Sequence, residues 1–195
     1  MGTEDLKKDL IKVSRWSGGR EWCPGTSGNV SVLNPDRGEV YIKGSGASML
    51  DLEPKDILTL DLEGNVIQGE GRPSKEVNFH LGIYKARGNV KAVLHTHSPF
   101  ATAYAAAGKE IPQVTATAQL TLKKVPLVEY APPGSPELAG YVIGGFKDPT
   151  VKALLLKNHG VVTIGDTVYR AYHINEWVED AAKVALLSSI IKRLS

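Results

Sequence analysis

The segment AVLHTHSP, residues 92–99, carries two histidines separated by one residue. It overlaps a short apolar run, residues 90–94, that predicts a buried strand. Because side chains at i and i+2 leave the same face of an extended chain, His95 and His97 are expected to point the same way. Neighbouring neutral imidazoles suit zinc and related divalent ions. For an isolated HxH motif, a solvated strand end with two incidental histidines is an equally good interpretation.

Two further residues could complete a metal site. His159 lies in the sequence Asn-His-Gly, 62 residues after His97, so only folding could bring it to the pair. Glu76 falls in the first turn of an expected helix, where an acid also compensates the helix dipole. A turn histidine and a dipole-compensating acid are the alternative interpretations. His80, in the same helix, is better explained as a helix histidine with satisfied hydrogen bonds.

Two loops rich in glycine and serine could bind an anion. The first, GTSGNVS, contains Thr26 and Asn29, and the second, KGSGASML, contains Lys43, Ser45 and Gly46. Small residues let the backbone approach a ligand, and hydroxyl groups can hold phosphate oxygens. Neither loop is a P-loop, because no GK[ST] follows. One such loop is usually an ordinary turn, but two loops near a basic side chain favour an anion site.

Composition places the chain among ordinary globular proteins. Of its 195 residues, 42% are hydrophobic and 23% charged, and we expect residues 1–195 to form one domain. A net charge of +2 without a Lys/Arg-rich block gives no indication of a nucleic-acid partner. The single Cys23 cannot form an internal disulfide. No apolar run reaches the roughly 20 residues of a membrane helix, and the charged start lacks a signal-peptide core. We therefore expect a cytoplasmic protein without a membrane partner.

Apolar spacing and turn residues predict the order of the elements. Helices are expected over residues 3–16, 73–87 (with Ser74 as its cap), 99–107, 136–146 and 167–194. Strands are expected over residues 30–33, 40–42, 57–60, 66–67, 90–94, 111–114, 125–128, 151–156 and 161–164. Antiparallel signals dominate before residue 73, and strands alternate with helices after it. This combination favours a three-layer α/β/α sandwich with a mixed, largely antiparallel central sheet.

Five motifs follow one another along the chain: GTSGNVS, GSG after a strand, RPSKE opening a helix, HTHSP and KNHGVVTIG. In this order and spacing they resemble the class II aldolases of the fuculose-phosphate aldolase and ribulose-phosphate 4-epimerase type, over residues 24–175. The resemblance implies the class II aldolase fold and a metal-dependent lyase. That lyase would reversibly cleave a ketose 1-phosphate, such as L-fuculose 1-phosphate, to dihydroxyacetone phosphate and a small aldehyde such as lactaldehyde. It also implies a homotetramer with its sites at subunit interfaces.

The resemblance further implies roles for individual residues. One zinc ion per subunit would bind His95, His97 and His159, although Mn²⁺, Co²⁺ and Fe²⁺ also accept imidazole. Glu76 would be the catalytic acid/base and could also sit on the metal. The substrate phosphate would contact residues of both loops and of the helix start, namely Thr26, Asn29, Ser45, Gly46 and Ser74. Lys75 stands where many relatives have Ser, so it either adds a charge to the phosphate or is simply solvated.

Other activities within the family remain open. Glu76 favours an aldolase, or a methylthioribulose-1-phosphate dehydratase, over the 4-epimerases, which usually carry Asp there. A non-enzymatic adducin-like binding domain is disfavoured, because the three histidines and Glu76 occur together. On the aldehyde side the sequence departs from the family. Its tyrosine from a neighbouring subunit falls near Ala116, and a phenylalanine is replaced by Pro133. Three tyrosines could substitute as proton donor: Tyr104, Tyr130 and Tyr141.

Overall fold

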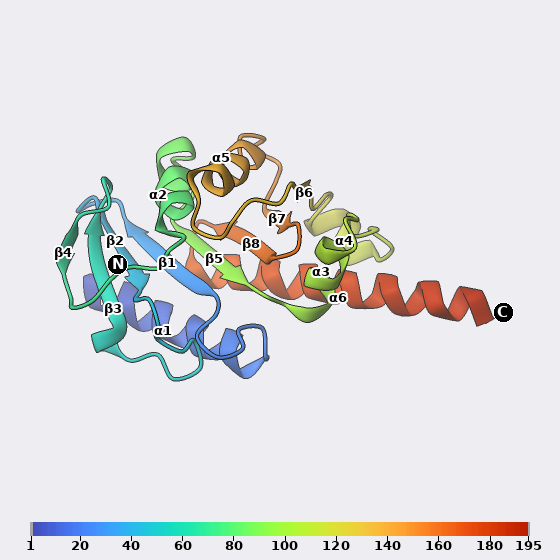
Figure 1. Ribbon diagram of the computed structural model, residues 1–195, viewed down its shortest axis with the longest axis horizontal. Helices are drawn as coiled ribbons and strands as arrows, with labels where there is room; N and C mark the ends of the chain where they lie inside the picture. The colour runs from blue at the N-terminus through green and yellow to red at the C-terminus, as the bar shows by residue number, and fades with distance from the viewer. Residues whose placement is uncertain (1, 195) are drawn as a thin grey trace.

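The structure is a computed structural model that describes residues 2–194 (Figure 1). The strands are β1 (Asn29–Asn34), β2 (Glu39–Lys43), β3 (Ile57–Asp61), β4 (Val66–Gln68), β5 (Ala92–Thr96), β6 (Leu127–Val128), β7 (Ala153–Leu156) and β8 (Gly160–Gly165). The helices are α1 (Thr3–Gly19), α2 (Val77–Ala86), α3 (Pro99–Ala106), α4 (Ala116–Thr121), α5 (Pro136–Gly145) and α6 (Val168–Leu194), with a 3-10 turn η1 (Pro54–Asp56).

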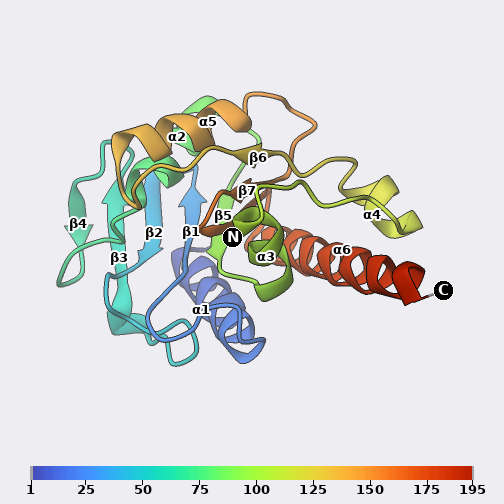
Figure 2. The ribbon, with the colours of Figure 1, turned by 45° about the vertical axis from the view of Figure 1, so that its right-hand side comes forward.

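These strands form one sheet in the order β4-β3-β2-β1-β5-β8-β7-β6. Neighbouring strands are antiparallel except β6 and β7, which are parallel. Helices α2 and α5 cover one face, while α1 and α6 cover the other (Figure 2). Alternate residues of one strand serve the two layers: Val93 packs with α2 and α5, and Leu94 packs with α1. The predicted three-layer sandwich with a mixed, largely antiparallel sheet is confirmed.

The pairing register brings distant segments to one end of the sheet. Asn29, the first residue of β1, is opposite His95 near the end of β5. Thr96 is opposite Val161, just after the turn that joins β7 to β8. The last residue of β2, Lys43, lies at the same end, because β2 runs antiparallel to β1. Both glycine-rich loops and the Asn-His-Gly turn therefore surround the end of β5.

Helix α2 begins later than the sequence predicts, at Val77 instead of residue 73. The reason is that the preceding segment is held extended against the second loop. Pro73 forms a β-bridge with Gly44, and the Ser45 N–H donates to the Arg72 carbonyl at 2.8 Å. Ser74 is consequently not the helix cap, and Glu76 occupies that position.

One predicted strand is absent from the described residues, and one helix was not predicted. Residues 111–114 form no strand, since Pro112 lacks a backbone N–H and the segment pairs with no described strand. Helix α4 was not predicted. It has 6 residues, and the Thr115 side chain caps its start by accepting the Ala118 N–H at 3.2 Å. Within residues 2–194, none of the helices is both long and apolar enough to span a lipid bilayer.

Candidate active site and metal centre

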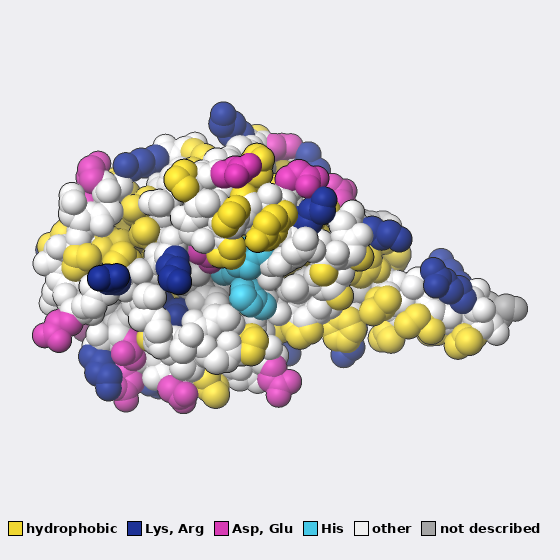
Figure 3. All heavy atoms as spheres, viewed as in Figure 1, with side chains coloured by type: hydrophobic (Ala, Val, Ile, Leu, Met, Phe, Trp, Pro, Cys, Tyr) yellow, Lys and Arg dark blue, Asp and Glu magenta, His cyan; other side chains and the backbone are white. Residues whose placement is uncertain are grey.

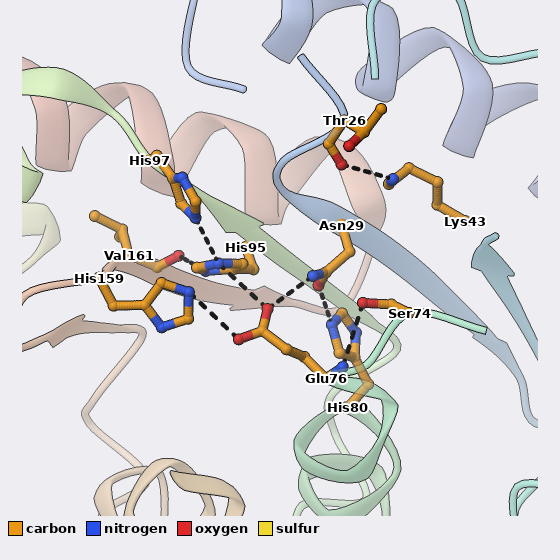
Figure 4. Close-up of polar contacts among 10 residues, drawn as sticks. All are labelled: Thr26, Asn29, Lys43, Ser74, Glu76, His80, His95, His97, His159 and Val161. Carbon is orange, nitrogen blue, oxygen red and sulfur yellow. Dashed lines mark hydrogen bonds and ion pairs between the residues drawn. The ribbon is translucent and has the colours of Figure 1, made fainter. Parts of the chain in front are cut away.

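Three imidazole rings meet at the end of β5 (Figure 4). The ring centroids of His95 and His97 are 5.0 Å apart, and His159 lies 4.7 Å from the first and 5.3 Å from the second. The Nε2 atoms of His95 and His97 are separated by 3.2 Å. One ring nitrogen from each residue lies within 4.8 Å of the others. Such a group could hold a divalent ion, as the sequence predicts.

The turn between β7 and β8 determines where His159 lies. A Cβ atom on Gly160 would come 2.4 Å from the Thr96 carbonyl oxygen and 2.9 Å from the His97 ring. Any side chain at position 160 would therefore push the turn away from β5. Asn158 has a φ of 56°, a left-handed conformation that asparagine tolerates. The Asn-His-Gly sequence thus allows the close approach that places His159 beside the other two rings.

The imidazoles are electrically neutral near pH 7. Burial lowers the pKa of His95 to about 3, with a smaller effect from His97, and lowers the pKa of His159 to about 4. Burial also lowers the pKa of His97. The Nδ1–H of His95 donates to the Val161 carbonyl at 2.9 Å, which leaves Nε2 with a free lone pair facing the other rings. Neutral imidazole with a fixed tautomer is the form that binds metal.

Glu76 lies against this group at the start of α2, and only 7% of it is exposed. Its Oε2 is 3.3 Å from His95 Nε2, and its Oε1 is 3.4 Å from His159 Nε2. Two buried atoms here, Glu76 Oε1 and His159 Nδ1, have no hydrogen-bond partner in the described structure. A buried carboxylate oxygen without a partner is costly. A cation among the three imidazoles would remove that cost for Glu76, so the residues present fit a divalent metal.

A cavity of about 320 Å³ opens beside the imidazoles, a volume within the range of small-molecule sites. It is lined by every residue that the sequence assigns to the phosphate and the metal, together with Lys43 and Pro133. Histidine side chains reach the surface in a hollow of this face (Figure 3). The two predicted subsites are therefore parts of one site.

Lys43 lies beneath the two glycine-rich loops and forms hydrogen bonds to both of them. It is only 2% exposed, and its Nζ donates to the carbonyl oxygens of Thr26 at 3.3 Å, Gly44 at 3.4 Å and Ala47 at 2.6 Å. Burial lowers its pKa. Because carbonyl dipoles hold the ammonium group, its positive charge remains beneath the loops and favours an anion there. Lys43 was noted in the sequence as a nearby cation but was not assigned to the site.

The predicted phosphate residues differ in how free they are. Thr26 and Ser45 are exposed on the loops, and Lys75 is exposed at the cavity. Ser74 is buried, and its Oγ accepts the Glu76 backbone N–H at 3.3 Å, which leaves its own hydroxyl hydrogen available. Asn29 lines the same cavity, and its side-chain amide also donates to Glu76 Oε2 at 2.9 Å, a contact that the sequence does not predict.

His80, Ser31 and Tyr84 join this site although the sequence analysis did not assign them to it. The His80 ring bonds to the Asn29 side chain through Nε2 and to Ser31 Oγ through Nδ1, which confirms it as a satisfied histidine. The spacing of these residues in the sequence could have indicated that they lie together. Glu76, His80 and Tyr84 are spaced by four on one helix face, and Asn29 and Ser31 are spaced by two on one strand face.

The metal-free protein is expected to lose stability as the pH falls below 6.5. His80 and His95 each have a pKa of about 3 when buried and 6.5 otherwise, so between these values only the unfolded chain takes up the proton. Each such group should lower the free energy of unfolding by about 1.4 kcal/mol per pH unit in that window. Urea unfolding at several pH values with chelator present measures the slope. His80→Gln should reduce this slope by the contribution of one proton. Equal slopes for the two proteins would contradict the low pKa of His80.

Comparison with known proteins gives consistent results. The family model "Class II Aldolase and Adducin N-terminal domain" matches residues 8–186. An L-fuculose phosphate aldolase of Methanococcus maripaludis is 38% identical over 184 residues, which are 94% of this chain and 98% of that protein. A solved L-fuculose 1-phosphate aldolase superposes with a TM-score of 0.88 at 31% identity, covering 98% of this chain and 89% of that one.

Two other relatives carry different names. A 5-deoxy-D-ribulose 1-phosphate aldolase of Bacillus thuringiensis is 35% identical over 160 residues, covering 82% of this chain and 74% of that protein. A 3-oxo-tetronate 4-phosphate decarboxylase of Haemophilus influenzae is 33% identical over 183 residues, covering 91% of this chain and 85% of that protein. Proteins similar to this chain are therefore named for different reactions, some as aldolases and one as a decarboxylase.

Proposed function

This chain belongs to the class II aldolase and adducin family, and on that premise we propose that it is a metal-dependent lyase of a ketose 1-phosphate. The substrate is of the L-fuculose 1-phosphate kind, and the products are dihydroxyacetone phosphate and a small aldehyde such as lactaldehyde. Residues 1–195 act as one catalytic domain. The observation that carries the proposal is a single cavity lined by three neutral imidazoles, a carboxylate and two loops rich in glycine and serine.

The phosphate of the substrate binds in the two loops. Thr26, Ser45 and Ser74 offer hydroxyl groups, and Gly46 offers open backbone. The buried charge of Lys43 lies beneath both loops and attracts the dianion. Lys75, at the exposed side of the cavity, is free to add a second positive charge.

His95, His97 and His159, with Glu76 beside them, hold one divalent cation. Zinc is the first choice for three imidazole ligands, and Mn²⁺, Co²⁺ or Fe²⁺ can use the same nitrogens. When bound, the cation supplies Lewis-acid polarisation of the substrate carbonyl and stabilises developing negative charge.

Cleavage breaks the bond between C3 and C4 of the ketose. The C4 hydroxyl loses its proton and becomes the aldehyde, while the electron pair of the broken bond stays on C3 and forms the enediolate of dihydroxyacetone phosphate. Glu76 takes up a proton from solvent in the open cavity and delivers it to C3 through Oε1, the oxygen without a hydrogen-bond partner. None of Tyr104, Tyr130 and Tyr141 lines the cavity among the described residues. The group that takes the C4 proton therefore comes from elsewhere.

A second candidate is decarboxylation of a 3-oxo-tetronate 4-phosphate, favoured by the relative of that name. Loss of CO₂ from that substrate leaves the same enediolate as aldol cleavage, so the same residues serve both reactions. The leaving group differs: decarboxylation needs no base for a hydroxyl proton, and among the described residues that line the cavity there is no tyrosine to serve as one.

One assay distinguishes these activities. The metal-loaded protein is incubated with L-fuculose 1-phosphate, with 3-oxo-tetronate 4-phosphate and with methylthioribulose 1-phosphate. Dihydroxyacetone phosphate together with lactaldehyde from the first supports the aldolase. Dihydroxyacetone phosphate with CO₂ from the second supports the decarboxylase, and water loss from the third would identify a dehydratase. Failure to release dihydroxyacetone phosphate from either of the first two would overturn the proposal.

The protein assembles into a homotetramer with its sites at subunit interfaces, which would allow a neighbour to complete the aldehyde side. The projecting end of α6 supports association (Figure 1). Its apolar side chains are exposed, including Leu187 at 46%, Ile191 at 66% and Leu194 at 83%. Exposed apolar patches of this kind mark interaction surfaces.

Light scattering is expected to give about 84 kDa, four times the 21.0 kDa chain. Ile191→Asp should shift the mass toward the single chain, because a charge on a buried apolar interface is costly. Ile67→Asp, at another exposed isoleucine, on β4, is the matched control and should leave the tetramer intact. A monomeric wild-type protein would contradict the assembly.

A further inference from the structure

A continuous line of buried polar groups runs from the hydroxyl of Tyr84 to the carboxylate of Glu76. Ser31 Oγ lies 2.6 Å from the Tyr84 hydroxyl and 2.7 Å from His80 Nδ1. His80 Nε2 then bonds to Asn29 Oδ1, and Asn29 Nδ2 bonds to Glu76 Oε2 at 2.9 Å. Figure 4 shows the part from His80 to Glu76. All five residues are buried, the most exposed at 7%.

The direction of every hydrogen bond follows from the carboxylate end. An ionised Glu76 can only accept, so the amide nitrogen of Asn29 faces it and the amide oxygen must accept from His80. His80 therefore carries its proton on Nε2, and its Nδ1 accepts the Ser31 hydroxyl hydrogen. Ser31 in turn accepts from the Tyr84 hydroxyl.

The opposite order is excluded by repulsion. A proton on His80 Nδ1 would direct the Nε2 lone pair at the Asn29 oxygen. Rotating the Asn29 amide would then place that oxygen against Glu76 Oε2. A doubly protonated ring is also disfavoured, because burial lowers the pKa of His80 to about 3.

We propose that Tyr84, Ser31 and His80 are positioning residues that fix Glu76 Oε2 through Asn29 and leave Oε1 as the oxygen that exchanges the proton with substrate. The inference rests on the proposed function, in which Glu76 is the acid/base. A second observation supports it: Oε1 has no hydrogen-bond partner and lies 3.4 Å from His159 Nε2, among the metal-centre residues. One oxygen is held, and the other is free to react.

The kinetic test compares variants along this line. His80→Leu removes the donor to Asn29 and should lower kcat about 100-fold, with KM changed less than about threefold, because misplacement of a catalytic group affects the transition state rather than substrate binding. His80→Gln can still accept from Ser31 and donate to Asn29, so it should recover most of that loss. Ser31→Ala removes the hydrogen bond to His80 Nδ1, which lets the ring shift while its proton stays on Nε2, and should lower kcat about tenfold. The matched control, Ser17→Ala, removes an equally buried hydroxyl from α1 and should leave kcat within about twofold.

Nitrogen NMR of the metal-free, ¹⁵N-labelled protein tests the order without substrate. His80 should be neutral with its proton on Nε2 in the wild-type protein and in Ser31→Ala alike, because the Asn29 oxygen accepts that proton in both. This measurement, and the mild Ser31→Ala variant, decide the matter even if His80→Leu fails to fold. A proton on Nδ1 in the wild-type protein overturns the proposal. So does unchanged kcat in Ser31→Ala or His80→Leu when only the unfolding midpoint falls. Absence of lyase activity in the wild-type protein would instead overturn the proposed function.

Discussion

Replacing Glu76 with glutamine is expected to lower kcat by about 10²–10⁴-fold, the range for removal of a general acid/base. Glutamine keeps the shape of the side chain, and its oxygen can still accept from the Asn29 amide. It cannot, however, take up and return a proton at neutral pH. The effect should therefore appear in kcat, with the fold intact and KM nearly unchanged.

Steady-state kinetics of dihydroxyacetone phosphate release measures this loss, with metal content determined on the same samples. Glu63→Gln is the control, because Glu63 is an exposed acid in the turn between β3 and β4. It should behave like the wild-type protein. If Glu76→Gln with a full complement of metal retained kcat within tenfold of the wild-type value, Glu76 would not be the acid/base.

Removing the metal should have a similarly large effect. Dialysis against a chelator is expected to lower turnover by at least about 10³-fold, since Lewis-acid stabilisation contributes several kcal/mol to the transition state. One equivalent of a divalent ion per chain should restore it. His159→Ala should lower both the bound metal and the activity, because it removes one of the three imidazoles.

The control for that variant is His173→Ala. His173 lies on the exposed side of α6, where it pairs with Glu176, and should be dispensable. Elemental analysis of the purified proteins gives the metal content directly. Full activity in a metal-free sample would reject the proposed chemistry, as would normal metal content in His159→Ala.

The pairing of His95 with His97 could be predicted because it is a local property of an extended chain. Side chains two residues apart share a face whatever the strand packs against. The place of His159 depended on something less visible in the sequence, namely the absence of a Cβ at Gly160, which lets the β7–β8 turn approach β5. The five ordered motifs nevertheless led to the prediction that His159 joins the other two histidines, because they resemble a known family. The fold is as that resemblance implied.

Predictions failed where a partner distant in sequence decided the outcome. The start of α2 was misplaced because Pro73 pairs with Gly44, and a helix signal carries no information on such a bridge. The hydrogen bonds of the Asn29 amide to Glu76 and His80 could not be predicted for the same reason, because they join residues 47 and 51 positions apart.

The two halves of the proposed substrate also differ in how far the sequence and fold account for their binding. In the proposed reaction, the half of the substrate that becomes dihydroxyacetone phosphate would bind the two loops that Lys43 joins. For the leaving half, the described residues that line the cavity include Pro133 and no tyrosine. The identity of the leaving group is therefore the property that the sequence and fold specify least, in agreement with relatives named for different reactions.

X-ray absorption of the zinc-loaded protein tests the central claim most directly, because it reports the atoms around the metal itself. The account predicts one zinc per chain with three imidazole nitrogens at about 2.0–2.1 Å and oxygen in the remaining positions. Cys23 should be absent from the coordination, since burial raises the pKa of its thiol to about 12. A spectrum with sulfur, or with fewer than three imidazoles, would contradict the account.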